Sequence, residues 1–310
     1  MILVFGGTGF VGRNLVPMLR EQGRNVRVVS RRPDGAFLDA HAPGTEHLTL
    51  EQFYADPAAA LFGCTSVIYL ASTSTPGANL TTPWQEAQDT LDPVLRVMSN
   101  LVEFGSDAGH MPHFVYLSSG GTVYGQVDQD MIHEDTPLNP ISPYGLGKKM
   151  SETAVDFMAR TRGLRATILR PANPIGQWQT SLSQGVVGAL CRAATQGASF
   201  PMLGDGSAVR DYFDVRDLAR AIIMTLDAPD ASVGQIWNVG SGCGNSVREI
   251  HALVQDVSGR DIAIETRPSR PTDVDRVVLD IGQINAALNW HPSHDLRDTL
   301  RGIWAGFEPV

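Results

Sequence analysis

A glycine-rich loop near the N-terminus limits the folds open to this chain more than any other feature. It follows an apolar, strand-like run over residues 2–5 and begins a helical stretch that ends near residue 21. The first glycine permits a tight turn, the second lets a phosphate approach the backbone, and the third lets the helix lie close to the sheet. A glycine turn without a ligand is the alternative. The position after the first strand favours a dinucleotide site that includes Gly6, Thr8, Gly9, Phe10, Val11 and Gly12.

Strand-like and helical segments alternate through the first 170 residues. Apolar β-type runs cover residues 26–30, 66–71, 114–118 and 166–170, and helical stretches cover residues 93–104 and 142–160. For the first of these helices we predict Asp92 as the N-cap and Pro93 in the first turn. The alternation predicts an α/β fold, a doubly wound parallel sheet of the Rossmann type with helices on both faces.

The pattern becomes less regular after Pro171. Helical pieces over residues 185–196, 215–226 and 247–259 are separated by loops rich in Gly, Pro and Asp. We therefore expect an NAD(P)-binding domain over residues 1–172 and a smaller α/β C-terminal lobe over residues 173–310. Residues 211–240 are expected to return to the first sheet.

Charge and cysteine content narrow the partners and the compartment. The chain has 24 Lys plus Arg against 33 Asp plus Glu, a formal net charge of −9, which argues against nucleic acid and anionic membranes as partners. No apolar run approaches the roughly 18–20 residues that span a bilayer. We expect the first strand to start at residue 2, without a signal peptide before it, and the three scattered cysteines to form no disulfide framework. We expect a reducing, cytoplasmic location.

The end of the second strand bears on the choice between NAD and NADP. This strand ends at Ser30, and Arg31 and Arg32 follow it. An acid at this place holds the ribose 2′-hydroxyl of NAD, whereas a guanidinium suits the 2′-phosphate of NADP. The residues favour NADP, or tolerance of both cofactors, and two solvated arginines are the alternative.

Tyr144 and Lys148 form the most informative pair of residues. Ser142 is placed to cap a helix and Pro143 to begin it, so Tyr144 and Lys148 fall one turn apart on the same face. A free tyrosine titrates near pH 10 and is a poor base at neutral pH. An ammonium about 4 Å away would favour the phenolate by roughly 4 kcal/mol before desolvation opposes it. We therefore expect the pair to move a proton to or from a substrate hydroxyl.

Further motifs extend along the chain. They read Val67-Ile-Tyr-Leu-Ala71, Ser118-Ser-Gly-Gly-Thr-Val-Tyr-Gly125, Arg170-Pro-Ala-Asn-Pro174, Gly204-Asp-Gly206, Arg210-Asp-Tyr-Phe213, Trp237-Asn-Val-Gly240 and Arg270-Pro-Thr-Asp273. With the glycine loop and the Tyr144–Lys148 pair, they make almost the whole chain resemble the extended short-chain dehydrogenase/reductase family, in its sugar-nucleotide epimerase/dehydratase branch. The resemblance implies cofactor contacts from Ser30, Arg31, Leu70, Ala71, Tyr144 and Lys148.

The motif that begins at the end of the predicted strand over residues 114–118 distinguishes reactions within this branch. Its dehydratases look like Ser-Thr-Asp-Glu-Val-Tyr-Gly, and the Asp–Glu pair supplies the acid and the base. Gly121 and Thr122 stand at those two places here, so the motif resembles the 4-epimerase pattern instead. The catalytic Ser or Thr of the family is replaced by Gly120, and either Ser119 or Thr122 is expected to supply the missing hydroxyl.

The resemblance also implies a set of substrate-binding residues. Arg210 and Arg270 lie in segments that bind the phosphates of a nucleotide sugar, and bidentate guanidinium contacts suit phosphate. Asn173 would contact the sugar or the phosphate, and Asp273 the ribose. Val277 stands where some epimerases carry a bulky tyrosine, which leaves room for UDP-GlcNAc as well as UDP-glucose.

The expected activity is therefore NAD(P)-dependent 4-epimerisation of a UDP-hexose by transient oxidation at C4. Tyr144 would remove the 4-hydroxyl proton, and Lys148 would lower the pKa of the tyrosine and bind the nicotinamide ribose. Two alternatives stay open: an NADPH-dependent 4-ketosugar reductase, favoured by Arg31 and Arg32, and a non-catalytic dinucleotide sensor, favoured by Gly120.

Two histidine pairs and two helices complete the expectations. The pairs His110–His113 and His291–His294 have a spacing that hints at a metal, but each lacks a third ligand, so we expect surface histidines and no metal site. In relatives of the resembling family the helices that correspond to 93–104 and 142–160 usually pair. A homodimer is therefore expected, with a nucleotide sugar as the substrate.

Overall fold

The computed structural model describes residues 1–32, 34–72, 82–179, 185–270 and 274–307. Its centre is a seven-stranded sheet in the order β11-β6-β5-β4-β1-β2-β3, in which every neighbouring pair is parallel. The strands are β1 (Ile2–Phe5), β2 (Val26–Ser30), β3 (Glu46–Thr49), β4 (Ser66–Tyr69), β5 (His113–Leu117), β6 (Ala166–Pro171) and β11 (Ile236–Val239). The predicted α/β class and doubly wound parallel sheet are confirmed.

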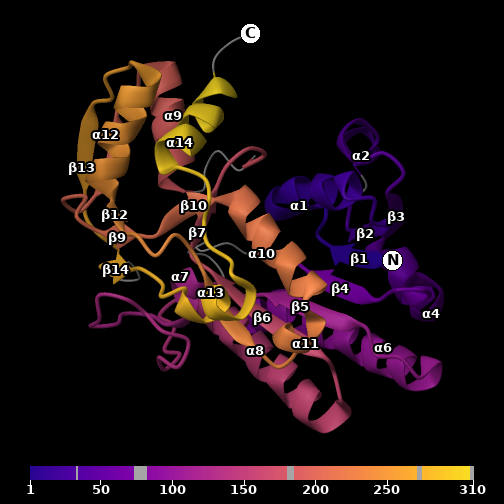
Figure 1. Cartoon of the computed structure of the whole chain (residues 1–310). Coiled ribbons are helices and arrows are strands. Elements are labelled where there is room, and N and C mark those ends of the chain that lie inside the picture. The colour runs from indigo at the N-terminus through magenta and orange to yellow at the C-terminus, as the bar shows by residue number, and fades with distance from the viewer. Residues whose placement is uncertain (33, 73–81, 180–184, 271–273, 308–310) are drawn as a thin grey trace.

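Helices cover both faces of this sheet (Figure 1). On one face α1 (Phe10–Glu21) and α10 (Val215–Asp227) bury apolar side chains such as Leu15 and Ile222, and on the other α6 (Asp92–Ala108) and α8 (Pro143–Arg162) bury Met98 and Val155. The smaller helices of this part are α2 (Gly35–His41), α3 (Leu50–Ala55), α4 (Pro57–Leu61), α5 (Pro83–Glu86), α7 (Gly120–Val123), α11 (Pro229–Ser232) and α13 (Gly282–Leu288).

A second group of elements has its own apolar core and lies at the upper left of Figure 1. Its helices are α9 (Val186–Gln196), α12 (Val247–Ser258) and α14 (Leu296–Ala305). Short sheets accompany them: β7 (Asn173–Ile175) with β10 (Tyr212–Asp214), β8 (Phe200–Leu203) with β13 (Ile264–Arg267), and β9 (Val209–Arg210) between β12 (Asn245–Ser246) and β14 (Arg276–Val277). In the large sheet β11 pairs with β6, so a late segment of the chain lies beside an early one.

The helix predicted over residues 93–104 begins earlier than expected, and the predicted cap is wrong. The helical path starts at α5 with Thr82 as its cap, passes through the π-helical turn η1 (Ala87–Leu91) and continues into α6, so Asp92 lies inside it. Pro93 lacks an N–H and its ring clashes with the carbonyl four residues earlier in a regular helix. The wider π turn directly before Pro93 accommodates the proline ring, because a π-helical turn interrupts the regular ladder of helix hydrogen bonds.

The prediction of surface histidines is wrong at His113. This residue begins β5 and is only 3% exposed, with its Nε2 2.8 Å from the Thr167 hydroxyl. Burial lowers the pKa of His113 to about 4, so the ring is neutral near pH 7. His110 and His291 are exposed, and His294 is half-buried.

In the described ranges no group of three His, Cys, Asp or Glu side chains gathers as a metal would require. The described helices also include none long and apolar enough to cross a membrane.

Candidate active site

The strand register brings the predicted cofactor residues to one edge of the sheet. Phe5 at the end of β1 pairs with Val29 of β2 on one side and with Tyr69 of β4 on the other, so these three parallel strands end at the same level. The glycine loop follows the first strand and the segment Leu70–Ala71 follows the last. Loops at the carboxyl ends of parallel strands form the ligand sites of doubly wound sheets.

Close packing explains the first and third glycines of the loop. Gly6 has φ +80°, and a Cβ there would lie 2.9 Å from the backbone nitrogen of Ala71. A Cβ on Gly12 would lie 2.5 Å from the Gly6 carbonyl oxygen. A side chain at either position is therefore excluded, and α1 lies directly against the loop.

The second glycine has more space. A Cβ on Gly9 would meet only the Gly6 carbonyl oxygen, at 3.3 Å. Gly9 is also the N-cap of α1, with no side-chain cap, and no acidic residue stands in the first turn of this helix. Phe10 and Val11 form this turn and are half-buried, as is Thr8. Backbone N–H groups without a side-chain cap are suited to an anion such as a phosphate.

The end of β2 lacks an acid that is free to bind a ribose. The Ser30 hydroxyl donates to the Arg32 carbonyl at 2.8 Å, and both Arg31 and Arg32 are exposed. The next acid, Asp34, caps α2 and forms an ion pair with Arg13. The arginines are thus the charged groups of this strand end that remain accessible.

Helix α8 begins as predicted. The Ser142 hydroxyl accepts a hydrogen bond from the Gly145 N–H at 3.1 Å, and Pro143 occupies the first turn. Two glycines of the following turn have steric causes that sequence reasoning missed. A Cβ on Gly145 would lie 2.7 Å from the Thr122 carbonyl oxygen, and one on Gly147 would lie 2.7 Å from Cγ of Glu86. Both glycines let α8 pack tightly at the level of Tyr144.

Tyr144 meets the strand-end motif through Ser119. The hydroxyls of Ser119 and Ser72 face the phenol of the half-buried Tyr144 and lower its pKa. The Thr122 hydroxyl is buried and has no hydrogen-bond partner among the described residues. Of the two candidate hydroxyls, the structure brings Ser119 to the tyrosine.

Lys148 is buried, at 3% exposed, and lies one turn beyond Tyr144. Its ammonium donates to the Leu117 carbonyl at 2.8 Å, and Nζ lies 5.8 Å from the centre of the Tyr144 ring. Burial lowers the pKa of Lys148 to about 8, although the charges of Glu152 and Glu86 raise it. Lys148 is thus a cation that is close to titration at neutral pH.

The expected lowering of the tyrosine pKa is wrong for the chain alone. The pKa of Tyr144 is raised to about 12, chiefly by burial, with the negative charge of Glu86 acting in the same direction and the hydroxyls of Ser119 and Ser72 opposing it. Desolvation therefore exceeds the stabilisation that we expected from Lys148, whose ammonium donates to a backbone carbonyl.

A buried polar network behind Lys148 was also missed. Glu152, one turn further along α8, accepts hydrogen bonds from the Ser118 hydroxyl and from the Arg170 guanidinium, the latter at 2.7 Å from Nη2. Arg170 also donates to the Tyr124 hydroxyl at 2.9 Å. In the sequence Glu152 stands four residues after Lys148, and this spacing indicates that both side chains lie on the same face of the helix. The network holds β5, β6 and α8 together beneath the Tyr144–Lys148 pair.

Two of the predicted substrate residues are strand partners. Val277 of β14 pairs with Arg210 of β9, and Val277 is buried at 1% exposed. The Asn173 amide nitrogen is buried and has no hydrogen-bond partner among the described residues. Arg270 is exposed, and Asp273 lies outside the described residues.

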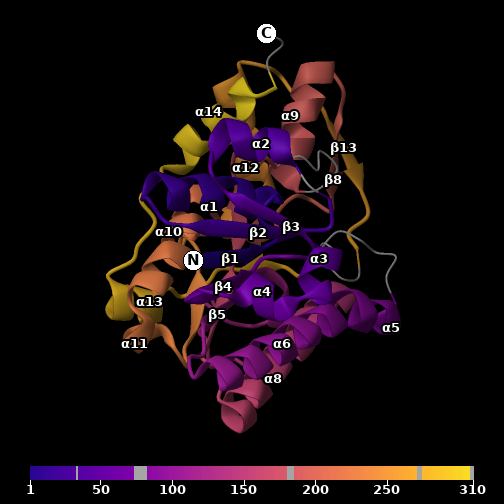
Figure 2. The same cartoon turned by 90° about the vertical axis from the view of Figure 1, so that its right-hand side faces the viewer.

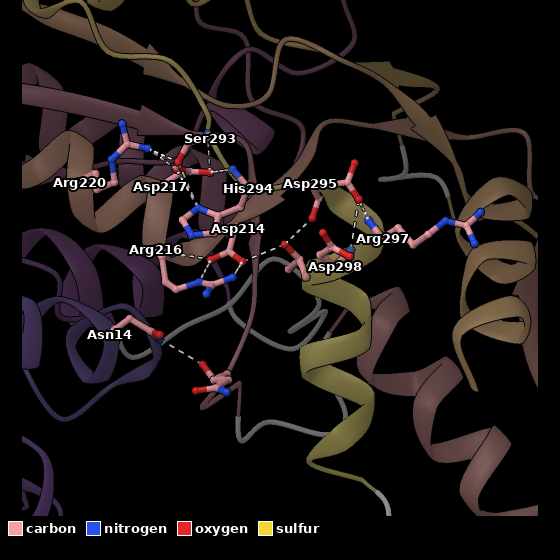
Figure 3. Close-up of polar contacts among 12 residues, drawn as sticks. Asn14, Asp214, Arg216, Asp217, Arg220, Ser293, His294, Asp295, Arg297 and Asp298 are labelled. Carbon is pink, nitrogen blue, oxygen red and sulfur yellow. Dashed lines mark hydrogen bonds and ion pairs between the residues drawn. The ribbon is translucent and has the colours of Figure 1, made fainter. Parts of the chain in front are cut away.

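Ion pairs fasten the C-terminal segment to α10 (Figure 3). The buried Asp217 carboxylate accepts from the Ser293 and His294 backbone N–H groups and pairs with Arg220. The His294 ring also contacts Asp217, with its Nδ1 3.0 Å from the carboxylate, so this histidine helps to hold the segment in place. At the other end of the same view, Asn14 of α1 donates to the Gln177 carbonyl at 3.0 Å.

Residues 2–240 match the profile of the NAD dependent epimerase/dehydratase family. The matched part runs from β1 to the end of β11 and includes the glycine loop, Ser119, Tyr144 and Lys148. The chain belongs to this family. Membership agrees with the resemblance seen in the motifs.

Named relatives carry the similarity over nearly the whole chain. The chain is 28% identical to a UDP-glucose 4-epimerase of Corynebacterium glutamicum, across 98% of this chain and 94% of that protein. It is 31% identical to a probable UDP-arabinose 4-epimerase of Oryza sativa subsp. japonica, across 98% of this chain and 78% of that protein. The crystal structure of UDP-glucose 4-epimerase from Thermotoga maritima, with UDP-glucose, has a TM-score of 0.88 at 28% identity, covering 99% of this chain and 98% of that chain.

Within the epimerase/dehydratase family, this chain departs from the usual motif at Gly120. A Cβ there would lie 2.5 Å from Cδ1 of Leu279 and 2.8 Å from the Arg170 carbonyl oxygen. The site therefore has no space for a serine or threonine at this position. The hydroxyl beside the tyrosine comes from the preceding residue, Ser119.

Proposed function

We propose that the chain is an NAD(P)-dependent nucleotide-sugar 4-epimerase that acts on a UDP-hexose. The observation that carries the proposal is the cluster in which the Ser119 hydroxyl faces the Tyr144 phenol and Lys148 Nζ lies 5.8 Å from the centre of the Tyr144 ring. The strand-end motif has no carboxylates at Gly121 and Thr122, which favours epimerisation over water elimination. The named relatives support the same activity.

The residues of the glycine loop fit a dinucleotide. Gly9 leaves space in front of the first turn of α1, and the uncapped N–H groups there would hold the pyrophosphate. Leu70 and Ala71 lie against the loop at Gly6 and would border the cofactor. When bound, the nicotinamide supplies a reversible hydride acceptor, and the chain positions the sugar and handles the proton.

Tyr144 would exchange a proton with the 4-hydroxyl of the sugar, with Ser119 holding both oxygens through hydrogen bonds. The phenolate is disfavoured in the chain alone, since burial raises the pKa of Tyr144 to about 12. Protonated Lys148 opposes this by its positive charge, and in the same position it would bind the nicotinamide ribose.

Substrate binding would use residues of β7, β9 and β14 and of the segment that follows β13. Asn173 would direct its buried amide, which has no hydrogen-bond partner within the described ranges, toward the sugar or the phosphate. Arg210 and Arg270 would bind the diphosphate, and Asp273 the ribose of the nucleotide. Val277, a small residue paired with Arg210, would leave space for a 2-acetamido group.

Incubation of the purified protein with UDP-glucose and UDP-GlcNAc, each with NAD or NADP, tests this function. We expect the C4 epimer of at least one substrate without net change in cofactor absorbance. The Tyr144→Phe variant should lose the activity and keep the unfolding midpoint of the unchanged protein. No new epimer from either sugar, or unchanged turnover in Tyr144→Phe, contradicts the proposal.

An NADPH-dependent 4-ketosugar reductase is the second candidate. The observation in its favour is the end of β2, where Arg31 and Arg32 are exposed and Asp34 is paired with Arg13. A reductase releases oxidised cofactor in every cycle, whereas an epimerase regenerates it. Net consumption of NADPH with a 4-ketosugar nucleotide, without epimer formation, would favour the reductase.

We also propose a homodimer formed through α6 and α8. These helices lie side by side (Figure 2), and the groove between them is lined by Leu91, Leu95, Leu146, Met150, Ala154 and Phe157. Phe157 is 52% exposed in the single chain, which is a large exposure for an apolar aromatic side chain. Light scattering should give twice the chain mass, and Phe157→Glu should give a monomer. A monomeric unchanged protein would contradict the dimer.

We also propose separate roles for the two parts of the chain. Residues 1–172, with 211–240, would bind the cofactor and carry out the chemistry, and the rest of residues 173–310 would mainly bind the sugar nucleotide. We propose a reducing, cytoplasmic location because Cys64, Cys191 and Cys243 are all unpaired.

A further inference from the structure

Glu86 is a buried carboxylate next to the candidate active site, and the mechanism above does not use it. It is the last residue of α5, directly before the π-helical turn η1, and its side chain is 0% exposed. Burial of a carboxylate is costly unless the group is hydrogen-bonded or lies near a positive charge. π-Helical turns are rare and frequently occur at functional sites.

The contacts of Glu86 point to helix α8. Its Oε1 accepts a hydrogen bond from the Thr90 hydroxyl at 2.6 Å, across the π turn. Its Cγ and Oε1 lie so close to Gly147 that a Cβ there would be 2.7 and 2.8 Å from them. Gly147 stands between Tyr144 and Lys148 in the sequence of α8. Figure 2 shows α5 beside this helix and α6.

We propose that Glu86 is a positioning residue of the Tyr144–Lys148 pair, whose buried negative charge keeps the Lys148 side chain in its ammonium form and so sets the pH range over which the pair works. The effect of Glu86 on turnover rests on the proposed function. The effect on Lys148 itself does not depend on what the enzyme converts.

The direction of the effect follows from the charges that face Lys148. Burial lowers the pKa of this lysine to about 8, and Glu152 and Glu86 raise it, in that order. Glu152 is itself neutralised by Arg170, to which it is bound through both oxygens. Tyr116 of β5 lies on another side, with its ring centre 5.1 Å from Nζ. Loss of the Glu86 charge should therefore move the titration of Lys148 toward neutral pH or below it.

The same charge acts on Tyr144 with the same sign. Glu86 raises the pKa of the phenol, while Ser119 and Ser72 lower it. Removing the carboxylate should thus shift both titrations to lower pH together. A defect that merely loosened the packing would not be expected to move the two in one direction.

The sequence offers an unusually clean measurement, because the chain contains only two lysines, Lys148 and Lys149. Protein labelled with ¹³C-lysine gives two sets of Cε resonances, and Lys148→Arg assigns them. Lys149, which donates to the Leu138 carbonyl at 2.7 Å, serves as the internal reference. We expect the Lys148 resonance of the unchanged protein to titrate with a midpoint near the pKa of about 8.

Glu86→Gln removes the charge and keeps an oxygen to accept from Thr90. We expect the Lys148 midpoint to fall by about one pH unit, the size expected when a nearby opposite charge is lost. Glu86→Asp retains the charge but withdraws it from α8 by one methylene, so its midpoint should fall by less. Asp89→Asn removes a charge from the same π turn and is the matched control, with no shift expected.

The pH profile of turnover gives the second readout. Both limbs of the kcat/KM profile should move to lower pH in Glu86→Gln, and neither in Asp89→Asn. A Lys148 midpoint in folded Glu86→Gln equal to that of the unchanged protein would overturn the role. If Glu86→Gln does not fold, an unshifted midpoint in Glu86→Asp would overturn it. Absence of any epimerase activity, with the midpoint shifted, would instead reject the proposed function alone.

Discussion

The Lys148 ammonium lies 5.8 Å from the centre of the Tyr144 ring and donates its hydrogen bond to the Leu117 carbonyl, at 2.8 Å. The lysine is therefore fixed by the end of β5 and acts on the tyrosine through its charge. Its influence depends on its protonation, and burial brings that protonation into the range of ordinary buffers.

The support that the Lys148 charge gives to the Tyr144 phenolate should decline as the pH rises through about 8, the pKa of Lys148. The pKa of this lysine is lowered from its ordinary value, so the ammonium is present below pH 8 and is lost above it. Lys148→Met should lower kcat on the order of a hundredfold or more below pH 8, where the ammonium is present, and by less above it. Lys148→Arg, which stays charged, should move the basic limb upward in a pH–rate profile. A basic limb at the same pH in Lys148→Arg would show that another group titrates.

Ser119→Ala should lower kcat by about tenfold or more, since it removes a hydroxyl that faces the reacting phenol and lowers its pKa. Thr122→Val should have a much smaller effect, because the Thr122 hydroxyl is buried without a hydrogen-bond partner in the described residues. Replacing an unpaired buried hydroxyl with a methyl group is neutral or stabilising. Steady-state kinetics of the two variants decide between the hydroxyls, and a larger loss in Thr122→Val would reverse the assignment.

Gly120→Ala should destabilise the fold by about 1–3 kcal/mol, the range measured for overpacked cores. The new Cβ would lie 2.5 Å from Leu279 and 2.8 Å from the Arg170 carbonyl oxygen. Gly121→Ala is the matched control, since its nearest neighbour would be the Asn173 Oδ1 at 3.6 Å, an ordinary contact. Urea unfolding measures both variants. Equal midpoints for the two variants would mean that Leu279 and the Arg170 carbonyl shift to make room for the new methyl group.

Local patterns predicted those parts of the fold that depend on neighbours in sequence. The bounds of β1 and β2 and the cap of α8 by Ser142 follow from apolar runs and from a serine–proline pair, and each agrees with the structure. The cap predicted at Asp92 failed because the helix continues backward through a π turn. That turn is packed against α8, a contact that no local pattern encodes.

Burial that arises from distant packing explains the other failures. His113 appeared polar and close to a loop, yet it begins a central strand and meets Thr167 of β6. Glu86 lies in a short polar segment, and it is buried where α8 approaches it at Gly147. The shift expected for the pKa of Tyr144 had the wrong direction for the same reason. The Tyr–Lys spacing predicts a nearby positive charge, but it does not predict the desolvation that opposes the effect of this charge.

Arg31→Ala with Arg32→Ala should raise the KM for NADP by about tenfold and change the KM for NAD much less. A charge-assisted hydrogen bond to a phosphate contributes about 1.5–3 kcal/mol, and only NADP has a 2′-phosphate. Arg162→Ala, which removes an exposed arginine at the far end of α8, is the control for net charge. Equal changes for both cofactors would show that the two arginines are merely solvated.

His113 should make the fold sensitive to acid. Its pKa is lowered from 6.5 to about 4, chiefly by burial and further by the charge of Arg165. The unfolded chain therefore binds a proton between these values while the folded chain does not, so stability is present above pH 6.5 and is lost as the pH falls toward 4. The loss amounts to about 3 kcal/mol at most. His113→Gln removes this titration, and urea unfolding at pH 7 and near pH 4 should show a smaller difference than in the unchanged protein. The exposed His110 provides the matched control, because His110→Gln should leave the difference as it was. An acid sensitivity that persists in full in His113→Gln would assign it to other buried groups.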